Sequence, residues 1–334
     1  MSAPEDETAL VGRAVGGDAE ALEEVVRRVQ DPVYRLALRM AGRPADAEDA
    51  AQEILIRVVT RLSSWRAEAS LVTWAYRIAV NHLLNLRRTA YEHRGITFEV
   101  LGENLAEGLA AADHRGPEAE LLAEEVRLGC TQAMLQCLDR SERVAYVLGE
   151  IFELPGEQAG WILEISPAAY RKRLERARKR IRAFMSATCG LVSRDAACRC
   201  ARRVESAIAH GRVDPRRPVF AGHATTGPRP GFDRPDSGRL GAGRPGSDRP
   251  GSDRPGSDRP ATGTRAVRVP ADAVAGRPGA AAVADGARQM RRLHDAATVM
   301  RSHPSYAAPR ARSEAVLSLL RSGRYPLLSA GSGG

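Results

Sequence analysis

The stretch SPAAYRKRLERARKRI, residues 166–181, combines a helix start, an apolar stripe and a dense run of positive charge. Ser166 followed by Pro167 is a strong helix start, because the hydroxyl can accept a backbone N–H and proline is tolerated at the first helical position. Apolar side chains then recur at steps of four, three and four, which predicts one buried stripe made of Tyr170, Leu174, Ala177 and Ile181. The remaining positions are mostly basic and should face outward.

The outward face of this predicted helix has little counter-charge of its own. Glu175 is the single acid between residues 166 and 181, so the pairing of opposite charges four residues apart that stabilises a solvated helix is almost missing. A merely solvated face is the alternative, but like charges at these spacings cost stability unless an anion offsets them. We therefore favour nucleic acid as the partner of this helix.

A second short amphipathic segment, PGEQAGWILEI at residues 155–165, precedes the basic helix. Two short helices joined by about three residues, the second capped and basic, form the helix-turn-helix pattern. The N-terminal half of the second helix should then enter the major groove. Arg171, Lys172, Glu175 and Arg176 are the candidates for base edges and nearby phosphates, and Arg178 and Lys179 lie further along and should hold the DNA backbone.

Composition sets the broad class of the protein. The chain has 334 residues, a formal net charge of +9 and five cysteines, and such a positive balance favours a polyanionic partner. It has no apolar run long enough to span a bilayer, and its start, MSAPEDETAL, does not read as a signal peptide. We therefore expect a cytoplasmic protein that has no membrane partner and no disulfide framework.

Composition also divides the chain into segments, and the fold class that it predicts is all-α. Residues 8–90 show helical periodicity with breaks near Asp31-Pro32, near Gly42 to Pro44 and across Ser63 to Ser70, which predicts a unit of about four helices. Residues 91–117 are acidic and contain glycine, as expected of a flexible linker. Periodicity returns over residues 118–186 and ends in the basic helix. The prediction is two helical domains joined by this linker.

The rest of the chain reads as an extension. Residues 187–213 carry three cysteines, residues 214–284 are rich in Pro, Gly and Arg and repeat GSDRP from Gly246 to Pro260, and residues 285–328 contain two short amphipathic segments. A tract of the middle composition cannot bury a core and should be disordered. The extension is therefore predicted to be largely disordered.

Two stretches of the first unit have unusual faces. In DAEDAAQEILIRVV, residues 46–59, Asp49, Gln52 and Glu53 share one polar helix face, and an acidic face on a basic chain needs an explanation. In WRAEASLVTWAYRIAVNHLLNLRR, residues 65–88, a polar loop precedes a helix with interleaved aromatic, amide and arginine side chains. Rings stack on bases, amides read base edges and arginines hold phosphate. The alternative for Trp74 and Ile78 is a place in the core.

DAEDAAQE, TWAYRIAVN and SPAAYRKRLERARKR, in this order, resemble the two conserved domains of a bacterial group 4 sigma factor of the extracytoplasmic-function (ECF) type, in the sigma-70 family. The resemblance covers residues 8–186. It implies a non-enzymatic subunit that directs core RNA polymerase to promoter DNA. Residues 8–90 would be sigma region 2, which docks on polymerase and recognises and melts the minus-10 element, and residues 118–186 would be region 4, which reads the minus-35 element.

The resemblance also implies roles for single residues. Asp49, Gln52 and Glu53 would dock on the coiled coil of the polymerase β′ subunit, with the β flap as a further contact, and residues 67–70 would capture a flipped base of the non-template strand. The implied minus-10 residues are Trp65, Arg66, Glu68, Ser70, Arg77, Asn81, Asn85 and Arg88. The implied minus-35 residues are Arg171, Lys172, Glu175, Arg176, Arg178 and Lys179. Glu164 departs from the family, which usually has a glycine in this turn, and a non-glycine residue in a left-handed position costs on the order of 1 kcal/mol.

Cys189, Cys198 and Cys200 follow the second domain with a spacing that differs from the usual zinc motifs. Three thiolates suit Cu(I), or Zn(II) with His210 as a fourth ligand, and the segment resembles the cysteine-bearing extensions of some of these sigma factors. Unligated thiols are the alternative, and the predicted function requires no cofactor. Cys130 and Cys137 are expected in the core.

The two terminal amphipathic segments are too short to fold alone. They are expected to fold back on the promoter-binding domains and regulate them, or to hold a partner; a separate anti-sigma factor is also left open. A plainer alternative is a tail that adds non-specific DNA affinity through arginine.

Two other function classes were weighed. A stand-alone helix-turn-helix regulator would not need the acidic face or the aromatic-amide helix. An enzyme is disfavoured because the sequence has no Ser/His/Asp grouping, no Gly-rich phosphate loop and no paired catalytic carboxylates.

Overall fold

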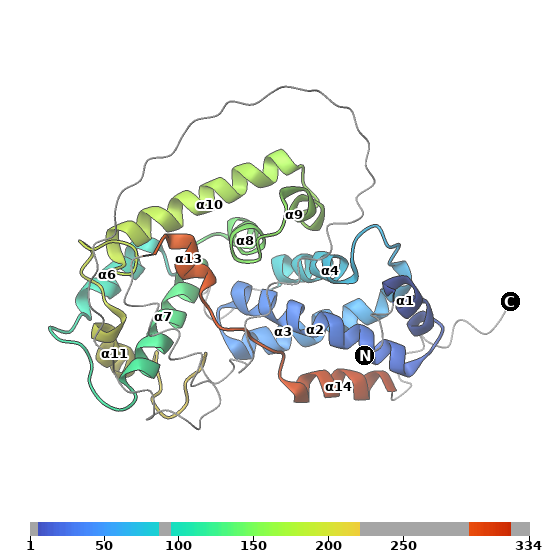
Figure 1. The fold of residues 1–334 in the computed structure, drawn as a ribbon, viewed down its shortest axis with the longest axis horizontal. Helices are drawn as coiled ribbons and strands as arrows, with labels where there is room; N and C mark the ends of the chain where they lie inside the picture. The colour runs from blue at the N-terminus through green and yellow to red at the C-terminus, as the bar shows by residue number, and fades with distance from the viewer. Residues whose placement is uncertain (1–5, 87–94, 221–293, 322–334) are drawn as a thin grey trace, which may run out of the picture.

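The computed structural model describes residues 6–86, 95–220 and 294–321, and the regular elements in these ranges are all helical (Figure 1). The backbones of Cys189 and Cys198 form an isolated β-bridge, which belongs to no strand. None of the helices in these ranges is long and apolar enough to cross a membrane. The predicted all-α fold class is confirmed.

The first domain consists of α1 (Glu7–Val15), α2 (Ala19–Ala41), α3 (Pro44–Thr60), a 3₁₀ turn (Leu62–Ser64) and α4 (Leu71–Asn85). Asp6, Asp18 and Ser70 begin α1, α2 and α4 by accepting backbone N–H groups of the first turn. Gly42 ends α2 in the left-handed conformation that glycine adopts without strain. Local cap chemistry thus sets most of the helix boundaries.

The predicted helix break at Asp31-Pro32 is wrong, because α2 continues through Pro32. An internal proline costs roughly 3 kcal/mol through its missing N–H and its ring. Val29, Val33 and Leu36 on the same helix are fully buried, and burying each such side chain contributes about 1.5–3 kcal/mol. Burial on both sides of the proline therefore outweighs its cost, and the chain breaks instead before Asp18, where Gly17 has φ 95°.

The predicted flexible linker, residues 91–117, contains a packed helix where the structure describes it. α6 spans Phe98–Glu107 and begins at Thr97, whose hydroxyl accepts from the N–H of Val100. Its Leu101 and Leu105 are buried. The expectation of a flexible segment is corrected here, because two leucines four residues apart gave the helix an apolar side that outweighs its acidic composition.

The second domain consists of α7 (Ala119–Gln136), α8 (Arg140–Tyr146), a π-helical turn (Val147–Ile151), α9 (Gly156–Leu163) and α10 (Pro167–Thr188). The extension adds α11 (Cys200–Ala209), α13 (Ala296–Arg301) and α14 (Arg310–Arg321). α11 packs on α7 through a small cluster that includes Leu122, Val204 and Ala207. Figure 1 shows α13 beside the second domain and α14 along the first domain.

The predicted disordered tract, residues 214–284, lies outside the described residues from position 221 onward. Its first residues are described, and they are packed. Phe220 is buried, and the N–H groups of Val219 and Phe220 donate to Glu125 Oε1 over 2.6 and 2.8 Å. The expected boundary at residue 214 is therefore moved, because an aromatic residue at position 220 finds a place against α7.

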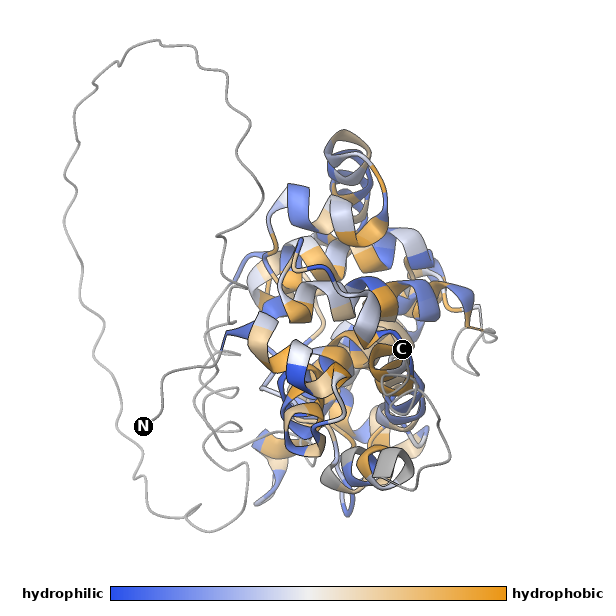
Figure 2. Cartoon of the chain, turned by 90° about the vertical axis from the view of Figure 1, so that its right-hand side faces the viewer, coloured by the Kyte–Doolittle hydropathy of each residue, from blue (hydrophilic) through white to orange (hydrophobic). Residues whose placement is uncertain are grey.

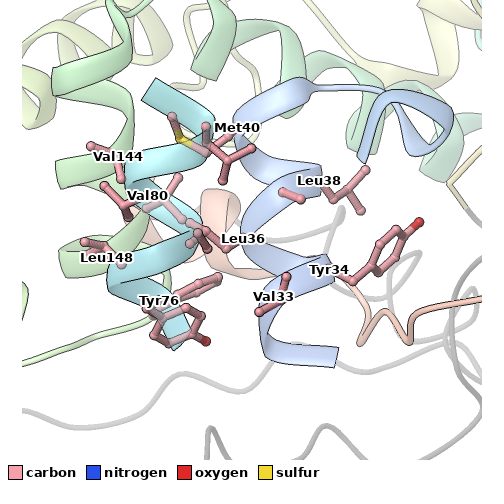
Figure 3. Packing of buried hydrophobic residues seen from close by; sticks show 14 of the residues in the cluster. Val33, Tyr34, Leu36, Leu38, Met40, Tyr76, Val80, Val144 and Leu148 are labelled. Atoms are coloured by element: carbon pink, nitrogen blue, oxygen red, sulfur yellow. The ribbon is translucent and has the colours of Figure 1, made fainter. Parts of the chain in front are cut away.

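One apolar cluster runs through both domains rather than one through each. Figure 3 shows Leu36 of α2, Tyr76 and Val80 of α4, and Val144 and Leu148 of the second domain directed toward one another. The Tyr76 ring also stacks on Phe152, with ring centroids 5.6 Å apart. Figure 2 shows hydrophobic and hydrophilic residues alternating along the helices, as this packing requires. The two domains therefore share a core in this structure.

A buried guanidinium joins the domains at the edge of this core. Arg143 is 2% exposed and donates to the carbonyl of Met40 at the end of α2 over 2.6 Å. It also donates to the carbonyls of Leu135 and Leu138 over 2.9 and 3.1 Å. Carbonyls at helix ends lack intrahelical donors, so this one side chain satisfies acceptors from both domains.

We predict that Arg143→Ala lowers the free energy of unfolding by about 3 kcal/mol, because buried carbonyls lose their donor. Urea unfolding of the full chain measures the change. Arg194→Ala is the matched control, since Arg194 is exposed, and should change stability by less than about 0.5 kcal/mol. Equal stability of the two variants would contradict this role of Arg143.

Candidate nucleic-acid interface

The basic helix α10 forms as its sequence predicts. Ser166 caps it by accepting from the N–H of Ala169 over 3.2 Å, and Pro167 is its first residue. The predicted stripe is buried, and it comprises Tyr170, Leu174, Ala177 and Ile181. The stripe faces α8 and α9, so the basic side of the helix is turned to the surface.

The prediction that the basic face lacks partners is wrong for part of the helix. Glu142 of α8 pairs with both Arg176 Nε (3.3 Å) and Arg180 Nη1 (2.7 Å). Glu150 of the π-helical turn pairs with Arg178. These acids come from elements packed beside α10 rather than from its own sequence. Arg176 and Arg178 therefore have structural partners in addition to any contact with DNA.

Four predicted minus-35 residues remain exposed without an ion pair among the described residues, and they are Arg171, Lys172, Glu175 and Lys179. The surface is hollowed beside them. The hollow is lined by Arg171, Lys172, Leu174, Glu175, Arg176 and Arg178. The N-terminal half of α10 thus offers both donors and an acceptor to a ligand on one open face.

The loop before α4 is more ordered than a free polar loop. Trp65 is 8% exposed, and its indole N–H donates to the carbonyl of Ala69 over 3.1 Å. Ala67 has φ 56°, a left-handed conformation that is strained for alanine. Arg66 and Glu68 are exposed. Trp65 therefore shapes the loop from inside, and its ring is not open for stacking in this structure.

The predicted minus-10 residues along α4 do not share one state. Asn81 and Asn85 are exposed, and Asn85 Nδ2 donates to the carbonyl of Asn81 over 2.8 Å. Ser70 accepts from the N–H of Thr73 as the cap of α4. Arg88 lies outside the described residues. Trp74 is half-buried against the core.

A contact between α4 and α9, which the sequence did not reveal, occupies Arg77. Its Nε lies 2.8 Å from Glu164 Oε1, and its guanidinium carbon lies 4.7 Å from the centre of the Trp161 ring. Beside it, Gln158 Nε2 donates to Thr73 Oγ1 over 2.6 Å. The helix-turn-helix of the second domain therefore covers part of the α4 surface.

Glu164 keeps the left-handed turn that its position in the sequence suggests. Its φ is 56° and ψ 37°, a conformation that costs a non-glycine residue about 1–2 kcal/mol. Its carboxylate is the partner of Arg77. Glu164 therefore has a strained backbone and also forms an ion pair between the two domains.

We predict that Glu164→Ala is less stable than Glu164→Gly by about 1 kcal/mol, since both lose the pair but only alanine keeps the strain. The free energy of unfolding of Glu164→Gly should remain within about 0.5 kcal/mol of that of the original chain. The relief of strain offsets the loss of the exposed ion pair, which contributes about 0.2–1 kcal/mol. Urea midpoints of the three chains test this. Two equally stable variants would rule out strain at this turn.

The acidic face of α3 is present as predicted. Asp49 and Glu53 are exposed and Gln52 is half-buried, while Ala51, Leu55 and Val58 on the opposite side are buried. His82 of α4 lies 3.6 Å from Glu53, and burial lowers the pKa of this histidine. The face is also in contact with α14, through Arg312.

The cysteines do not form an evident metal centre. An isolated backbone β-bridge brings Cys189 and Cys198 together, and both thiols are free. Cys200 begins α11. No group of three or more His, Cys, Asp or Glu side chains is placed to hold a metal ion within the described ranges. His210 ends α11, whose other end is Cys200, and ten residues of helix span about 15 Å. His210 therefore lies at the far end of α11 from Cys200, and metal binding by the three cysteines, with or without His210, stays a prediction.

Burial keeps the thiols protonated. It raises the pKa of Cys198 to about 11 and that of Cys137 to about 12. It also raises the pKa values of Cys130, Cys189 and Cys200. Cys137 is buried in the core as expected, and Cys130 is half-buried against it.

We predict that alkylation of Cys198 by iodoacetamide at pH 8 is at least about tenfold slower in the native chain than in urea, because the thiolate is the reactive form. The native rate should keep rising between pH 8 and pH 10, whereas the rate in urea levels off near the ordinary thiol pKa. Mass spectrometry of each cysteine peptide gives the rates. Equal rates at pH 8 would show that Cys198 is not buried in solution.

The chain is similar in sequence to a known protein family and to several of its members. The family model described as Sigma-70 region 2 matches residues 25–92. The chain is 35% identical to "ECF RNA polymerase sigma factor SigE" of Mycolicibacterium smegmatis over 175 residues, covering 51% of this chain and 65% of that protein. It is 32% identical to "ECF RNA polymerase sigma factor SigW" of Bacillus subtilis over 171 residues, covering 50% of this chain and 89% of that protein.

A solved structure, "Structure of CnrH in complex with the cytosolic domain of CnrY", is also similar. It is 22% identical, with a TM-score of 0.39, over 54% of this chain and 96% of that chain. The two sigma-factor relatives and the region 2 match are the findings that bear on the family.

Proposed function

Because the chain belongs to the ECF group of RNA polymerase sigma factors, which serve transcription initiation, we propose how its described surfaces perform that task. The chain binds core RNA polymerase in the cytoplasm and directs it to promoters that carry a minus-35 and a minus-10 element. It supplies recognition and strand separation. The bond-forming chemistry stays with the polymerase.

The observation that carries this proposal is the exposed N-terminal half of α10. In a helix-turn-helix, the residues at this end of the second helix contact base edges in the major groove. Arg171, Lys172 and Glu175 are exposed around the hollow there. Arginine and lysine donate to guanine and glutamate accepts from cytosine, so this face supports reading of the minus-35 element. Lys179, further along, is placed to hold phosphate.

Residues of α4 and the loop before it support recognition of the minus-10 element. Asn81 and Asn85 present amides at the surface, and amides can read the edges of unpaired bases. The loop turns at Ala67, which has a left-handed backbone, and the Trp65 indole N–H donates to the carbonyl of Ala69. Removing one base from the stack costs a few kcal/mol, and Arg66 and Glu68 border the loop that would receive it. Arg77 becomes available to DNA only when α9 leaves α4.

The acidic face of α3 supports docking on the β′ coiled coil of polymerase. Asp49 and Glu53 are exposed there, and exposed acids attract a complementary basic surface. The β flap is the proposed contact of the second domain. Binding of a separate anti-sigma factor to the same surfaces stays a prediction.

A stand-alone helix-turn-helix regulator is the second candidate, and the acidic face disfavours it. Such a regulator needs DNA contacts but no polymerase contact. A run-off assay separates the two, because only a sigma factor makes core polymerase start at new sites.

We predict that this chain, added to purified bacterial core RNA polymerase on fragmented genomic DNA, yields specific new run-off transcripts. Arg171→Ala should reduce them strongly, because a base contact is worth about 1–3 kcal/mol. Lys179→Ala should weaken DNA binding on all sequences alike and lower the salt slope by about 1.

Arg194→Ala is the control for both variants, since this exposed arginine lies beyond α10. Intact DNA binding without any transcript would contradict the proposed function and favour the regulator. Equal transcription by Arg171→Ala and the control would remove α10 as the reading helix.

A further inference from the structure

Residues 294–321 form a strap that crosses from the second domain to the first. The strap contains α13, an extended connection and α14, and Figure 1 shows it passing from the side of α7 and α10 to the far side of α2 and α3. Five of its apolar side chains are buried: Ala296, Val299, Met300, Tyr306 and Val316. The strap is therefore packed on both domains, although a long Pro/Gly/Arg-rich tract separates it from them in sequence.

The first part of the strap is anchored on the second domain. The N–H of His294 donates to the carbonyl of Leu191 over 2.8 Å. Arg301 pairs with Glu150 over 3.1 Å. Arg127 of α7, itself buried, donates to the carbonyl of Ser302 over 2.9 Å, so polar as well as apolar contacts position this end.

The second part is anchored on α2. Arg35 Nε donates to the carbonyl of Tyr306 over 3.1 Å. The N–H of Ala308 donates to Asp31 Oδ1 over 2.9 Å. These contacts lead the chain directly to the first turn of α14.

Arg312 in α14 then lies on the acidic face of α3. Its Nη2 is 3.0 Å from Asp49 Oδ1, and its Nε is 3.5 Å from Glu48 Oε2. Its Nη1 is 3.2 Å from Gln52 Oε1. One guanidinium thus contacts two of the three residues proposed to dock on polymerase, and a bulky basic surface could not reach Asp49 and Gln52 at the same time.

The strength of these contacts suits a reversible competitor. The Arg312 side chain is 44% exposed and that of Asp49 is 70% exposed. Exposed ion pairs are weak and are screened by salt. The buried apolar residues and the hydrogen-bonded anchors keep α14 near the acidic face of α3, whereas the ion pairs of Arg312 determine how strongly α14 binds that face.

We propose that residues 294–321 act as an intramolecular competitor of core RNA polymerase, with Arg312 occupying the acidic face of α3 until polymerase displaces it. This inference rests on the proposed docking role of that face. The chain thereby carries its own inhibitor of docking, and the second, independent anchor at Asp31 sets how readily it leaves.

The test measures the affinity of full-length variants for purified core polymerase, together with run-off transcription by each. Arg312→Glu places an acid against Glu48 and Asp49 and should drive α14 off, tightening binding by about threefold to tenfold. Asp31→Ala removes the acceptor of the Ala308 N–H and should tighten binding in the same direction by a smaller factor. Arg194→Glu makes the same charge change on the second domain, away from α14 and the acidic face of α3, and should leave affinity unchanged.

Increased affinity and transcription for both strap variants, with the control unchanged and the gain of Arg312→Glu shrinking at high salt, would support the proposal. Equal affinity of all four chains, with transcription from each, would overturn it while leaving the sigma activity intact. Weaker binding by Arg312→Glu would also overturn it, because Arg312 would then belong to the polymerase contact. Absence of polymerase binding by every chain would overturn the proposed function and this inference together.

Discussion

The buried guanidinium of Arg143 is the contact on which much of the structure depends. It donates to the ends of two helices from different domains, at Met40 and at Leu135. Buried carbonyls need donors, and a charged donor gives the stronger hydrogen bond. Through it α8 is fixed against α2, and α8 in turn supports the stripe of α10. The shared apolar cluster then closes around this junction, so the two domains are packed together in this structure.

This closed arrangement has a consequence for function. α9 covers part of α4 through Arg77, Trp161 and Glu164, while α14 covers the acidic face of α3. The exposed half of α10, which is proposed to bind DNA, stays open. Under the proposed function, reading two promoter elements at once requires α9 to leave α4, and docking of the acidic face on polymerase requires α14 to leave α3. Under the same proposal, the free chain is a state that precedes initiation, and polymerase binding must supply the free energy of opening.

Local sequence patterns correctly predicted features that depend on the spacing of residues within one helix. The cap at Ser166, the stripe from Tyr170 to Ile181 and the acidic face at Asp49 depend on spacing along one helix, and all three are present. Patterns could not show which element covers a face. The ion pairs of Arg176 and Arg178 with α8 and the π-helical turn, and the contact of Arg77 with Glu164, join residues far apart in sequence. The acidic composition of residues 91–117 did not indicate α6, which its two leucines stabilise. The predicted break at Pro32 was wrong because burial outweighs the local effect of proline. The roles of single residues in promoter recognition came from the family resemblance and stay proposals.

The most direct test of this account is the distance between the two domains in solution. A pair of fluorophores on Glu20 in α2 and Ser186 in α10, introduced without using the native thiols, reports it by energy transfer. The account predicts one short distance in the free chain and a longer one in the complex with core polymerase and promoter DNA. A free chain that already shows the long distance, or a distance that does not change on initiation, would contradict a closed resting state.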